Sequence, residues 1–361
     1  MRLAFLGLSA SGKTTLFNAL TGAHASVGTY SGAGTEIHIG QIHVDDARLD
    51  VIRKVFDPKK MTPAVVEVVD TPPLAVAAHE SREGNARLIA TLREADALVL
   101  LVRAFASGRV PHPRGTVDPA RDLTDLRTEL VVADLDIVEK RIGKLNRDIR
   151  RGQPAPTDAK ELAALERCVP ELDAGRGLAA LEFSPEQQKL LSSFAFLTMK
   201  PVIVVMNVGE EIVRGDEKPT WSEKDVAGLR CLDICAEWEM EVHELPRAEW
   251  AEYLGDLGIE EPCDGRFVRV VYEVMDFVTF FTCNQNELRA WQLRRYSAAI
   301  DAAAAVHTDM ARGFIRAEVI AVADLKELGS VKEVRSHGKE RLEGKTGPVH
   351  DGDLIHFRFS V

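Results

Sequence analysis

The segment that most constrains this chain is the octapeptide at residues 7–14, which reads Gly-Leu-Ser-Ala-Ser-Gly-Lys-Thr. It fits the pattern G-x-x-x-x-G-K-[ST], in which a loop between a buried strand and a helix holds phosphate groups. The flanks agree, because residues 3–6 are apolar and residues 15–20 can begin a helix. The glycines let successive backbone N–H groups point at phosphate oxygens, and the helix N-terminus adds positive charge. The motif therefore predicts a nucleoside triphosphate site.

Three side chains are predicted to act on the triphosphate. Lys13 is expected between the β- and γ-phosphates, and the Thr14 hydroxyl is expected to bind Mg²⁺. Asp70 ends the apolar run at residues 64–69 and is the expected outer partner of the same ion, although a strand-ending aspartate before a turn is the plain alternative. The loop residues predicted to surround the phosphates are Gly7, Ser9, Ala10, Ser11, Gly12, Lys13, Thr14 and Thr15.

Composition limits the remaining possibilities. The 361 residues are 45% hydrophobic and 28% charged, a globular profile with enough chain for two or three domains. A formal net charge of −11 repels bulk nucleic acid, so DNA sequence readout is not expected and any RNA contact needs a local basic patch. The five scattered cysteines indicate free thiols. With no apolar run of membrane-spanning length, the expectation is a soluble, cytoplasmic protein that does not bind membranes.

The order of apolar segments predicts an α/β nucleotide-binding domain. Residues 64–69, 97–102 and 202–206 are nearly all apolar, as strands buried on both faces are, and a helical segment at 84–94 separates the first two. This alternation predicts a doubly wound, mostly parallel sheet.

A long interval between the last two of these strands is predicted to be helical. Apolar residues recur every three to five positions from Leu123 to Ile149, a Pro-rich break follows at 153–156, and a second helical pattern begins near Leu162. Together they predict an inserted helical hairpin, or coiled-coil arm. Its apolar residues are explained by packing, and the alternative that the arm also contacts a partner stays open.

The chain changes character near residue 277. Segments rich in β-branched and aromatic residues at 277–282, 317–322 and 354–359 are separated by glycines and polar turns. They predict a small α+β domain. The predicted organisation is a first part of the nucleotide-binding domain at 1–118, the arm at 119–197, a second part at 198–276 and the C-terminal domain at 277–361.

Several of these segments resemble the YchF family of Obg-like P-loop ATPases and GTPases. The resemblance covers essentially the whole chain and implies a G-domain, an inserted arm and a C-terminal TGS domain of the β-grasp type. It also implies binding of ATP or GTP with Mg²⁺, and contact with the ribosome or RNA through the arm and the TGS domain. The matching segments are residues 7–8, 12–20, 46–50, 93–97, 102–105, 129–130, 133–136, 197–202, 207–210, 306–309, 313–319, 341–345 and 351–359.

The run at 207–210, Asn-Val-Gly-Glu, stands where related GTPases carry the guanine-reading N-K-x-D motif. It lacks the lysine, and its glutamate is one bond longer than aspartate, so guanine is expected to fit poorly. The resemblance agrees, since family members with N-x-x-E prefer ATP or accept both nucleotides. The residues expected near the base are Asn207, Val208, Glu210, Cys235 and Ala236.

Two segments depart from the family pattern. The second switch of the family begins D-x-x-G, with the glycine N–H on the γ-phosphate, but this chain reads Asp70-Thr71-Pro72-Pro73, and Pro73 has no N–H. The Mg²⁺-binding threonine of the first switch is assigned to Thr35, which needs one inserted residue in the alignment. No water-activating residue is evident; the histidines that could serve are His24, His38, His43 and His79.

The favoured hypothesis is therefore a nucleotide-dependent switch that hydrolyses ATP slowly and associates with ribosomes or RNA. A cluster of cations near the C-terminus supports an RNA contact, and a solvated loop is its plain alternative. The second hypothesis is a non-hydrolysing nucleotide-binding scaffold that has lost its switch at Pro73. A P-loop kinase for a small molecule is the third. The cations of the C-terminal cluster are Lys332, Arg335, Lys339, Arg341, Lys345 and Arg358.

Overall fold

A computed structural model describes residues 1–23, 37–75, 82–152, 155–226, 228–246, 249–259 and 261–360. The chain divides into two compact units. The first consists of Met1–Gly40 and Glu67–Asp264, and the second of Gln41–Val66 and Gly265–Val361. Among the described residues, no helix is both long and apolar enough to span a bilayer.

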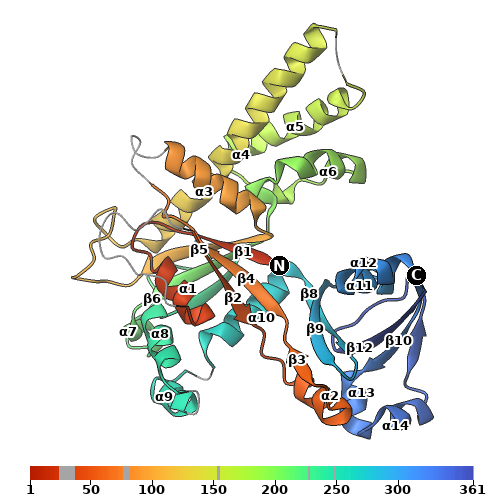
Figure 1. The fold of residues 1–361 in the computed structure, drawn as a ribbon. Coiled ribbons are helices and arrows are strands. Elements are labelled where there is room, and N and C mark those ends of the chain that lie inside the picture. Colours follow the sequence, from red (N-terminus) through yellow and green to blue (C-terminus); the bar gives the residue numbers. More distant parts are fainter. Residues whose placement is uncertain are drawn as a thin grey trace. The chain divides into compact units, whose positions relative to one another are not determined.

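The first sheet has the strand order β2-β4-β1-β5-β6-β7 (Figure 1). Strand β1 pairs in parallel with β4 and β5, and the parallel pairing continues from β5 to β6 and from β6 to β7. This confirms the predicted α/β fold with a mostly parallel sheet. The strands are β1 (Arg2–Leu6), β2 (His38–His43), β4 (Val65–Asp70), β5 (Ala97–Ala104), β6 (Val202–Val208) and β7 (Arg230–Ile234).

Helices cover both faces of this sheet (Figure 1). Helices α1 (Lys13–Thr21) and α8 (Ala236–Glu244) pack against each other on one face, while α3 (Arg82–Glu94) and α4 (Pro119–Arg150) lie on the other. Leucines of α3 and α4 pack on alternate residues of β5 in one core, which is why β5 is buried along its whole length. The further short helices of this unit are α7 (Glu210–Val213), α9 (Trp250–Asp256) and α10 (Cys263–Met275), the last of which crosses into the second unit.

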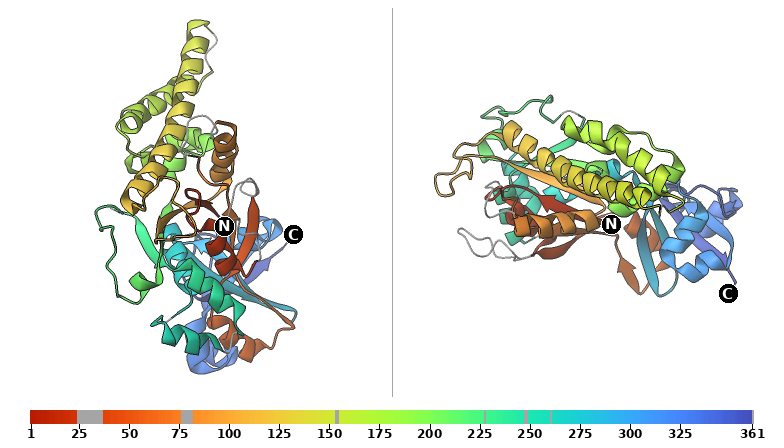
Figure 2. Two further views of the ribbon diagram at one scale, coloured as in Figure 1. Left: turned by 90° about the vertical axis from the view of Figure 1, so that its left-hand side faces the viewer. Right: turned by 90° about the horizontal axis from the view of Figure 1, so that it is seen from above.

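The inserted arm consists of α4, α5 (Asp158–Asp173) and α6 (Pro185–Leu191), as Figure 2 shows from two sides. Asp118 caps α4 by accepting a hydrogen bond from Arg121 N, and Pro119 occupies the first turn. The distal half of α4 shares a separate apolar core with α5 and α6. The 3₁₀ turns that return the chain to β6 are η1 (Leu178–Ala180), η2 (Ser192–Phe194) and η3 (Leu197–Met199).

A buried carboxylate anchors the arm to the sheet. Asp134 of α4 is 0% exposed, and its two oxygens accept hydrogen bonds from the backbone N–H groups of Leu197 and Thr198. The Thr198 hydroxyl and the Arg93 guanidinium donate to the same carboxylate. These bonds satisfy the buried charge and fix α4 at its midpoint.

The second unit has a mixed sheet in the order β11-β10-β12-β8-β9-β3. Strand β3 (Lys60–Thr62) pairs in parallel with β9 (Glu287–Arg294), so residues 41–66, which the predicted limits assign to the nucleotide-binding domain, join the C-terminal unit. Arg48 of α2 (Arg48–Phe56) strengthens this join through Asp351 at 2.6 Å. The other elements are β8 (Phe277–Cys283), β10 (Phe314–Ala321), β11 (Arg341–Glu343), β12 (Asp353–Phe359), α11 (Ala299–Val306), α12 (Thr308–Arg312), α13 (Val322–Leu328) and α14 (Val331–Ser336).

Candidate functional site

The carboxyl ends of the parallel strands meet at one edge of the first sheet, where α/β proteins bind ligands. The loop at residues 7–12 follows β1, Asp70 is the last residue of β4, Asn207 lies near the end of β6, and Cys235 follows β7. Strand order therefore brings together the predicted phosphate and base motifs, although almost 200 residues lie between Thr14, which ends the first motif, and Asn207, which begins the second.

The phosphate loop needs its glycines for close approach and for backbone conformation. A Cβ on Gly7 would lie 2.5 Å from the Leu101 carbonyl oxygen. Gly12 has φ 91°, and a Cβ there would lie 2.1 Å from Asn207 Nδ2. Ala10 also has a positive φ of 59°, which is costly outside glycine. The loop is thus held in one tight shape that leads into α1.

Lys13 lies inside this loop and is only 7% exposed. Its ammonium group donates hydrogen bonds to the carbonyl oxygens of Gly7 at 3.0 Å and Leu8 at 3.1 Å. An ammonium group has three donors, so these two bonds fix its direction and leave a third donor for an anion. Burial lowers the pKa of Lys13 to about 8, and the nearby Asp70 carboxylate opposes that shift.

Thr14 and Asp70 form the second part of the site. The Thr14 hydroxyl donates to Asp70 Oδ2 at 2.7 Å, and His38 Nδ1 lies 3.6 Å from the same oxygen. Asp70 is 3% exposed, and its other oxygen, Oδ1, has no hydrogen-bond partner among the described residues. The buried Ser11 hydroxyl is likewise without a partner in that part of the chain. Buried polar atoms of this kind indicate a site for a polar ligand.

These groups fit Mg²⁺ with a phosphate ligand. A hydroxyl and a carboxylate are the oxygen ligands that Mg²⁺ takes from proteins, with waters and substrate phosphates completing its shell. No cluster of three or more His, Cys, Asp or Glu side chains exists among the described residues, so no all-protein metal cage competes with this arrangement there.

Asn207 ties the phosphate loop to the base side of the site. Its Nδ2 donates to the Ser11 carbonyl oxygen at 3.0 Å, and its Oδ1 accepts from Ala236 N at 3.1 Å. The side chain is buried at 5% exposure. The Asn207 amide therefore joins two backbone segments. The N–H of Ala236, a residue that the sequence predicts near the base, already donates its hydrogen bond to this amide.

The other predicted base-side residues differ in exposure. Val208, Cys235 and Ala236 are buried, with Val208 and Cys235 in the core beneath the sheet edge. The Glu210 carboxylate is half-exposed and lies 3.4 Å from the Arg214 guanidinium. Arg214 in turn stacks on Trp238, with 5.1 Å between the guanidinium carbon and the ring centre. Glu210 is therefore accessible, but a cation already accompanies it.

The segment after Asp70 is bonded to β1 and the phosphate loop. The Thr71 hydroxyl donates to the Phe5 carbonyl oxygen, and the Leu74 N–H donates to the Gly7 carbonyl oxygen at 3.0 Å. Leu74 and Leu8 form a parallel bridge. Between these two attachments lie Pro72 and Pro73, which have no N–H to offer a phosphate.

Not every predicted residue can be placed. Thr35, His24 and His79 lie outside the described residues. Ser9 is exposed and Thr15 half-buried, and His43 is exposed on β2.

Arg103 is a buried residue that sequence reasoning did not select. It is the penultimate residue of β5, in register with Asn207, and donates to the carbonyl oxygens of Phe105 and Val110. Burial lowers its pKa, and its Nη1 has no hydrogen-bond partner among the described residues. The sequence signal for this buried arginine was a single cation near the end of an otherwise apolar strand.

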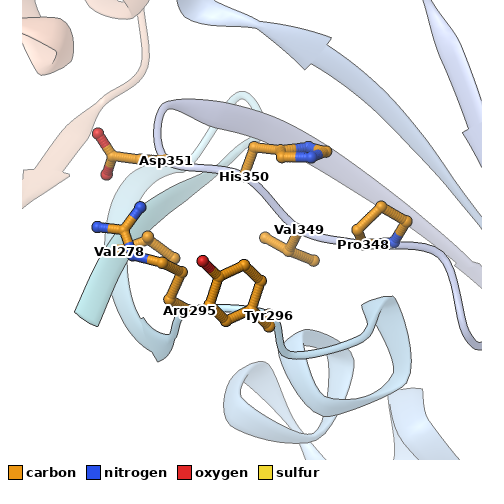
Figure 3. Close-up of a pocket in the computed structure, with 7 residues that line it drawn as sticks. All are labelled: Val278, Arg295, Tyr296, Pro348, Val349, His350 and Asp351. Carbon is orange, nitrogen blue, oxygen red and sulfur yellow. The ribbon is translucent and has the colours of Figure 1, made fainter. Parts of the chain in front are cut away.

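A separate cavity lies in the second unit (Figure 3). It has a volume of about 240 Å³ and is lined by Val278, Arg295, Tyr296 and residues 348–351. Tyr296 is 86% exposed, while Arg295 pairs with Asp276, and Asp351 accepts from the Thr279 N–H and from Arg48. None of the predicted nucleotide-site residues lines it.

The basic cluster of the C-terminal domain is largely neutralised by ion pairs. Arg335 pairs with Glu340, Arg358 with Glu318, and Lys339 with Asp324. Arg341 pairs with the buried Asp353 at 2.6 Å. Four of the six cations therefore have carboxylate partners, which weakens the cluster as a phosphate-binding surface.

A glycine loop at the end of a parallel strand, an inward lysine at a helix N-terminus and a hydroxyl–carboxylate pair beside it define a P-loop NTPase. The family comparisons agree with this class. Residues 2–138 match the family model described as 50S ribosome-binding GTPase, and residues 277–360 match YchF-GTPase_C, described as a protein of unknown function (DUF933).

Full-length relatives identify the family. The chain is 36% identical over 366 residues to the protein named ribosome-binding ATPase YchF of Haemophilus influenzae, covering 100% of this chain and 99% of that protein. It is 34% identical to the Bacillus subtilis protein of the same name, with 99% and 98% covered. The solved Schizosaccharomyces pombe YchF GTPase has a TM-score of 0.83 at 25% identity, over 99% of this chain and 97% of that one. The chain belongs to the YchF family.

Proposed function

We propose that this chain binds ATP, and also accepts GTP, together with Mg²⁺, and that it hydrolyses ATP slowly as a nucleotide-dependent switch on the ribosome. The observation that carries the proposal is the arrangement of Lys13, Thr14 and Asp70 around a loop with unsatisfied buried oxygens. The proposed setting is the cytoplasm, where the ribosome is found.

Each side chain has a proposed part in binding. The third donor of Lys13 binds a phosphate oxygen while the carbonyls of Gly7 and Leu8 hold the other two. Thr14 and Asp70 would hold Mg²⁺, directly or through water, with Thr35 as a proposed further ligand. Bound Mg²⁺ supplies positive charge against the charge that develops on the phosphates. Backbone N–H groups of the loop bind the remaining oxygens.

Slow hydrolysis is proposed because the described residues of the site are suited to position phosphates, and none of them is assigned to an attacking water. Charge neutralisation and positioning supply most of the catalysis in phosphoryl transfer. His38 Nδ1 lies 3.6 Å from Asp70 Oδ2, and the prolines at 72–73 offer no N–H to the γ-phosphate. A partner that completes the site would then raise the rate.

Base preference is proposed from Glu210 and Asn207. Asn207 uses both ends of its side-chain amide to bind Ser11 and Ala236, so the amide is not available to the base. Glu210, which stands where guanine-binding proteins have a rigid carboxylate, already lies beside the Arg214 guanidinium. A site that does not pair with the guanine edge has no strong reason to reject adenine. The relatives named ribosome-binding ATPases agree with this preference.

Phosphate release tests the proposal most completely. Purified protein would be assayed with ATP and with GTP, each with and without ribosomes, alongside Asp70→Asn and an exposed control, Asp216→Asn. We expect slow release from ATP, acceleration by ribosomes and loss in Asp70→Asn only. Tight ATP binding with no release under any condition would favour the non-hydrolysing scaffold instead. Transfer of phosphate to a small molecule would favour a kinase.

A further inference from the structure

His38 lies beside the hydroxyl–carboxylate pair that the nucleotide site offers to a cation. It is the first residue of β2, and Asp70 is the last residue of the neighbouring strand β4 (Figure 1). Its Nδ1 lies 3.6 Å from Asp70 Oδ2, the same oxygen that accepts a hydrogen bond from the Thr14 hydroxyl at 2.7 Å. Strand order therefore brings an imidazole nitrogen next to the two oxygen atoms of the predicted metal site.

The close approach of β2 to helix α1 limits where this imidazole can lie. A Cβ on Gly40, two residues along β2, would lie 2.7 Å from Thr21 Cγ2 and 2.8 Å from Phe17 Cζ, so only glycine fits at this distance from the helix. The His38 ring packs near Phe17 of the same helix, with 6.2 Å between the ring centres. Its side chain is 29% exposed, against 4% for Asp70, so a ligand entering the site can still reach it.

The spacing of the three donor atoms fits adjacent ligands of one six-coordinate cation. Bonds of about 2.1 Å to oxygen or nitrogen place adjacent ligands of an octahedral ion roughly 3 Å apart. Thr14 Oγ1 lies slightly closer than this to Asp70 Oδ2, and His38 Nδ1 lies slightly further away. Rotation about the last side-chain torsion of histidine, which has a broad energy minimum, is enough to bring the imidazole in.

A direct hydrogen bond explains the position of His38 less well. Such a bond would hold Nδ1 and the carboxylate oxygen about 2.7 to 3.2 Å apart, and the observed distance is 3.6 Å. Packing against Phe17 accounts for the ring of His38, but it does not account for a nitrogen facing the carboxylate that ends β4. The arrangement therefore suits a cation that both atoms bind.

An imidazole nitrogen changes which cation the site favours. Mg²⁺ takes oxygen ligands and gives up its waters reluctantly. First-row transition ions accept imidazole, and their affinity for sites of nitrogen and oxygen atoms rises from Mn²⁺ through Co²⁺ to Ni²⁺. A donor set of one hydroxyl, one carboxylate and one imidazole therefore favours these ions over Mg²⁺ more strongly than the two oxygen ligands alone would.

We propose that His38 is a direct nitrogen ligand of the divalent cation that binds with the nucleotide, and that it shifts the preference of the site from Mg²⁺ towards first-row transition ions such as Co²⁺ and Mn²⁺. The inference rests on the proposed nucleotide site and adds the cation preference to it. Thr14 and Asp70 supply the oxygen ligands, and phosphate oxygens and water complete the shell. Mg²⁺ is accepted too, with water in place of the imidazole.

The test measures cation preference in wild type, in His38→Gln and in a control, His356→Gln. Glutamine is polar but has no imidazole, and His356 is an exposed histidine on β12 of the second unit. Affinities for Mg²⁺ and for Co²⁺ are measured by isothermal titration in the presence of the ATP analogue AMP-PCP, which is not hydrolysed and has no nitrogen between its phosphates. Thermal melting shows whether each protein is folded.

A spectroscopic measurement reports the proposed bond itself. Spin-echo electron paramagnetic resonance of the Mn²⁺ and AMP-PCP complex detects a nitrogen atom bound directly to the ion. Wild type grown with isotopically labelled histidine shows whether that nitrogen comes from a histidine, and this comparison needs no substitution.

We expect the ratio of Co²⁺ affinity to Mg²⁺ affinity to fall at least about tenfold in His38→Gln and to stay unchanged in His356→Gln. The histidine nitrogen signal should appear in wild type and in the control and be absent from His38→Gln, while all three proteins bind AMP-PCP with Mg²⁺. Wild type without a nitrogen signal, or an affinity ratio unaffected by His38→Gln, would overturn the inference and leave the nucleotide site intact. Wild type that binds no AMP-PCP with any of the three ions would defeat the proposed function, and the inference with it.

Discussion

Removing the Asn207 side chain is the sharpest single perturbation of the site. Asn207→Ala takes away the donor to the Ser11 carbonyl at 3.0 Å and the acceptor from Ala236 N at 3.1 Å. Both bonds are buried, and the sequence separations are 196 and 29 residues, so no local contact can replace them. One backbone carbonyl and one backbone N–H lose their partner.

The magnitude follows from the two unsatisfied groups. A buried polar group without a partner costs about 1 to 3 kcal/mol. Loss of the hydrogen bond to the Ser11 carbonyl oxygen acts on the phosphate loop, because this bond holds the loop in its binding conformation. A loss of about 1 to 3 kcal/mol in the population of that conformation weakens ATP binding roughly fivefold to 150-fold. The Ala236 side acts mainly on folding stability.

Isothermal titration of ATP with Mg²⁺ into wild type and Asn207→Ala measures the first effect, and thermal melting measures the second. Asn146→Ala, on the inserted arm, is the matched control and should bind ATP like wild type. Asn207→Asp keeps an acceptor for Ala236 N but sets a buried carboxylate oxygen against the Ser11 carbonyl oxygen, so it should lose both affinity and stability. If Asn207→Ala is folded and binds ATP within twofold of wild type, the amide does not hold the loop and the reasoning is refuted.

Three other changes have expected outcomes. Pro73→Gly supplies an N–H, and one hydrogen bond to a charged phosphate, about 1.5 to 3 kcal/mol, should raise the ATP/ADP affinity ratio roughly tenfold to hundredfold; an unchanged ratio counts against this. Burial lowers the pKa of Lys13 to about 8, so the neutral amine must regain a proton before it can bind phosphate at higher pH. ATP affinity should therefore be constant below pH 8 and fall above pH 8 by up to about tenfold per pH unit. An ATP affinity that stays unchanged up to pH 9 would contradict this expectation. EDTA should weaken ATP binding by wild type but hardly that of Thr14→Val, and equal weakening would remove Thr14 from the metal site.

The sequence predicted the parts of the fold that depend on local pattern. The phosphate loop, the strand ending at Asp70 and the helical arm all follow from residue spacing within short segments, and the structure has elements at each of these positions. Strand β9 and the alanine-rich helix α11 carried usable signals, an alternation at 287–293 and a run of helix formers, but were not predicted. Val322, predicted in a strand, begins α13 instead.

Interactions between distant residues could not be read from those patterns. The two bonds of Asn207 depend on strand order, and the pairing of Arg358 with Glu318 depends on cross-strand register in the second sheet. For that reason the sequence overestimated the C-terminal basic cluster and missed Arg103 as a buried cation beside Asn207. Charge in sequence shows how many cations exist, whereas register decides which of them have partners.

The most direct test of the account is an equilibrium titration of ATP, with Mg²⁺ present, into wild type and Lys13→Ala. Lys13 binds the carbonyl oxygens of Gly7 and Leu8 in the loop and has one N–H donor left for a phosphate. The account predicts one site per chain in wild type and an affinity at least about hundredfold lower in Lys13→Ala, with both proteins folded. Equal affinity in the two proteins would show that the nucleotide binds elsewhere and would contradict the central claim.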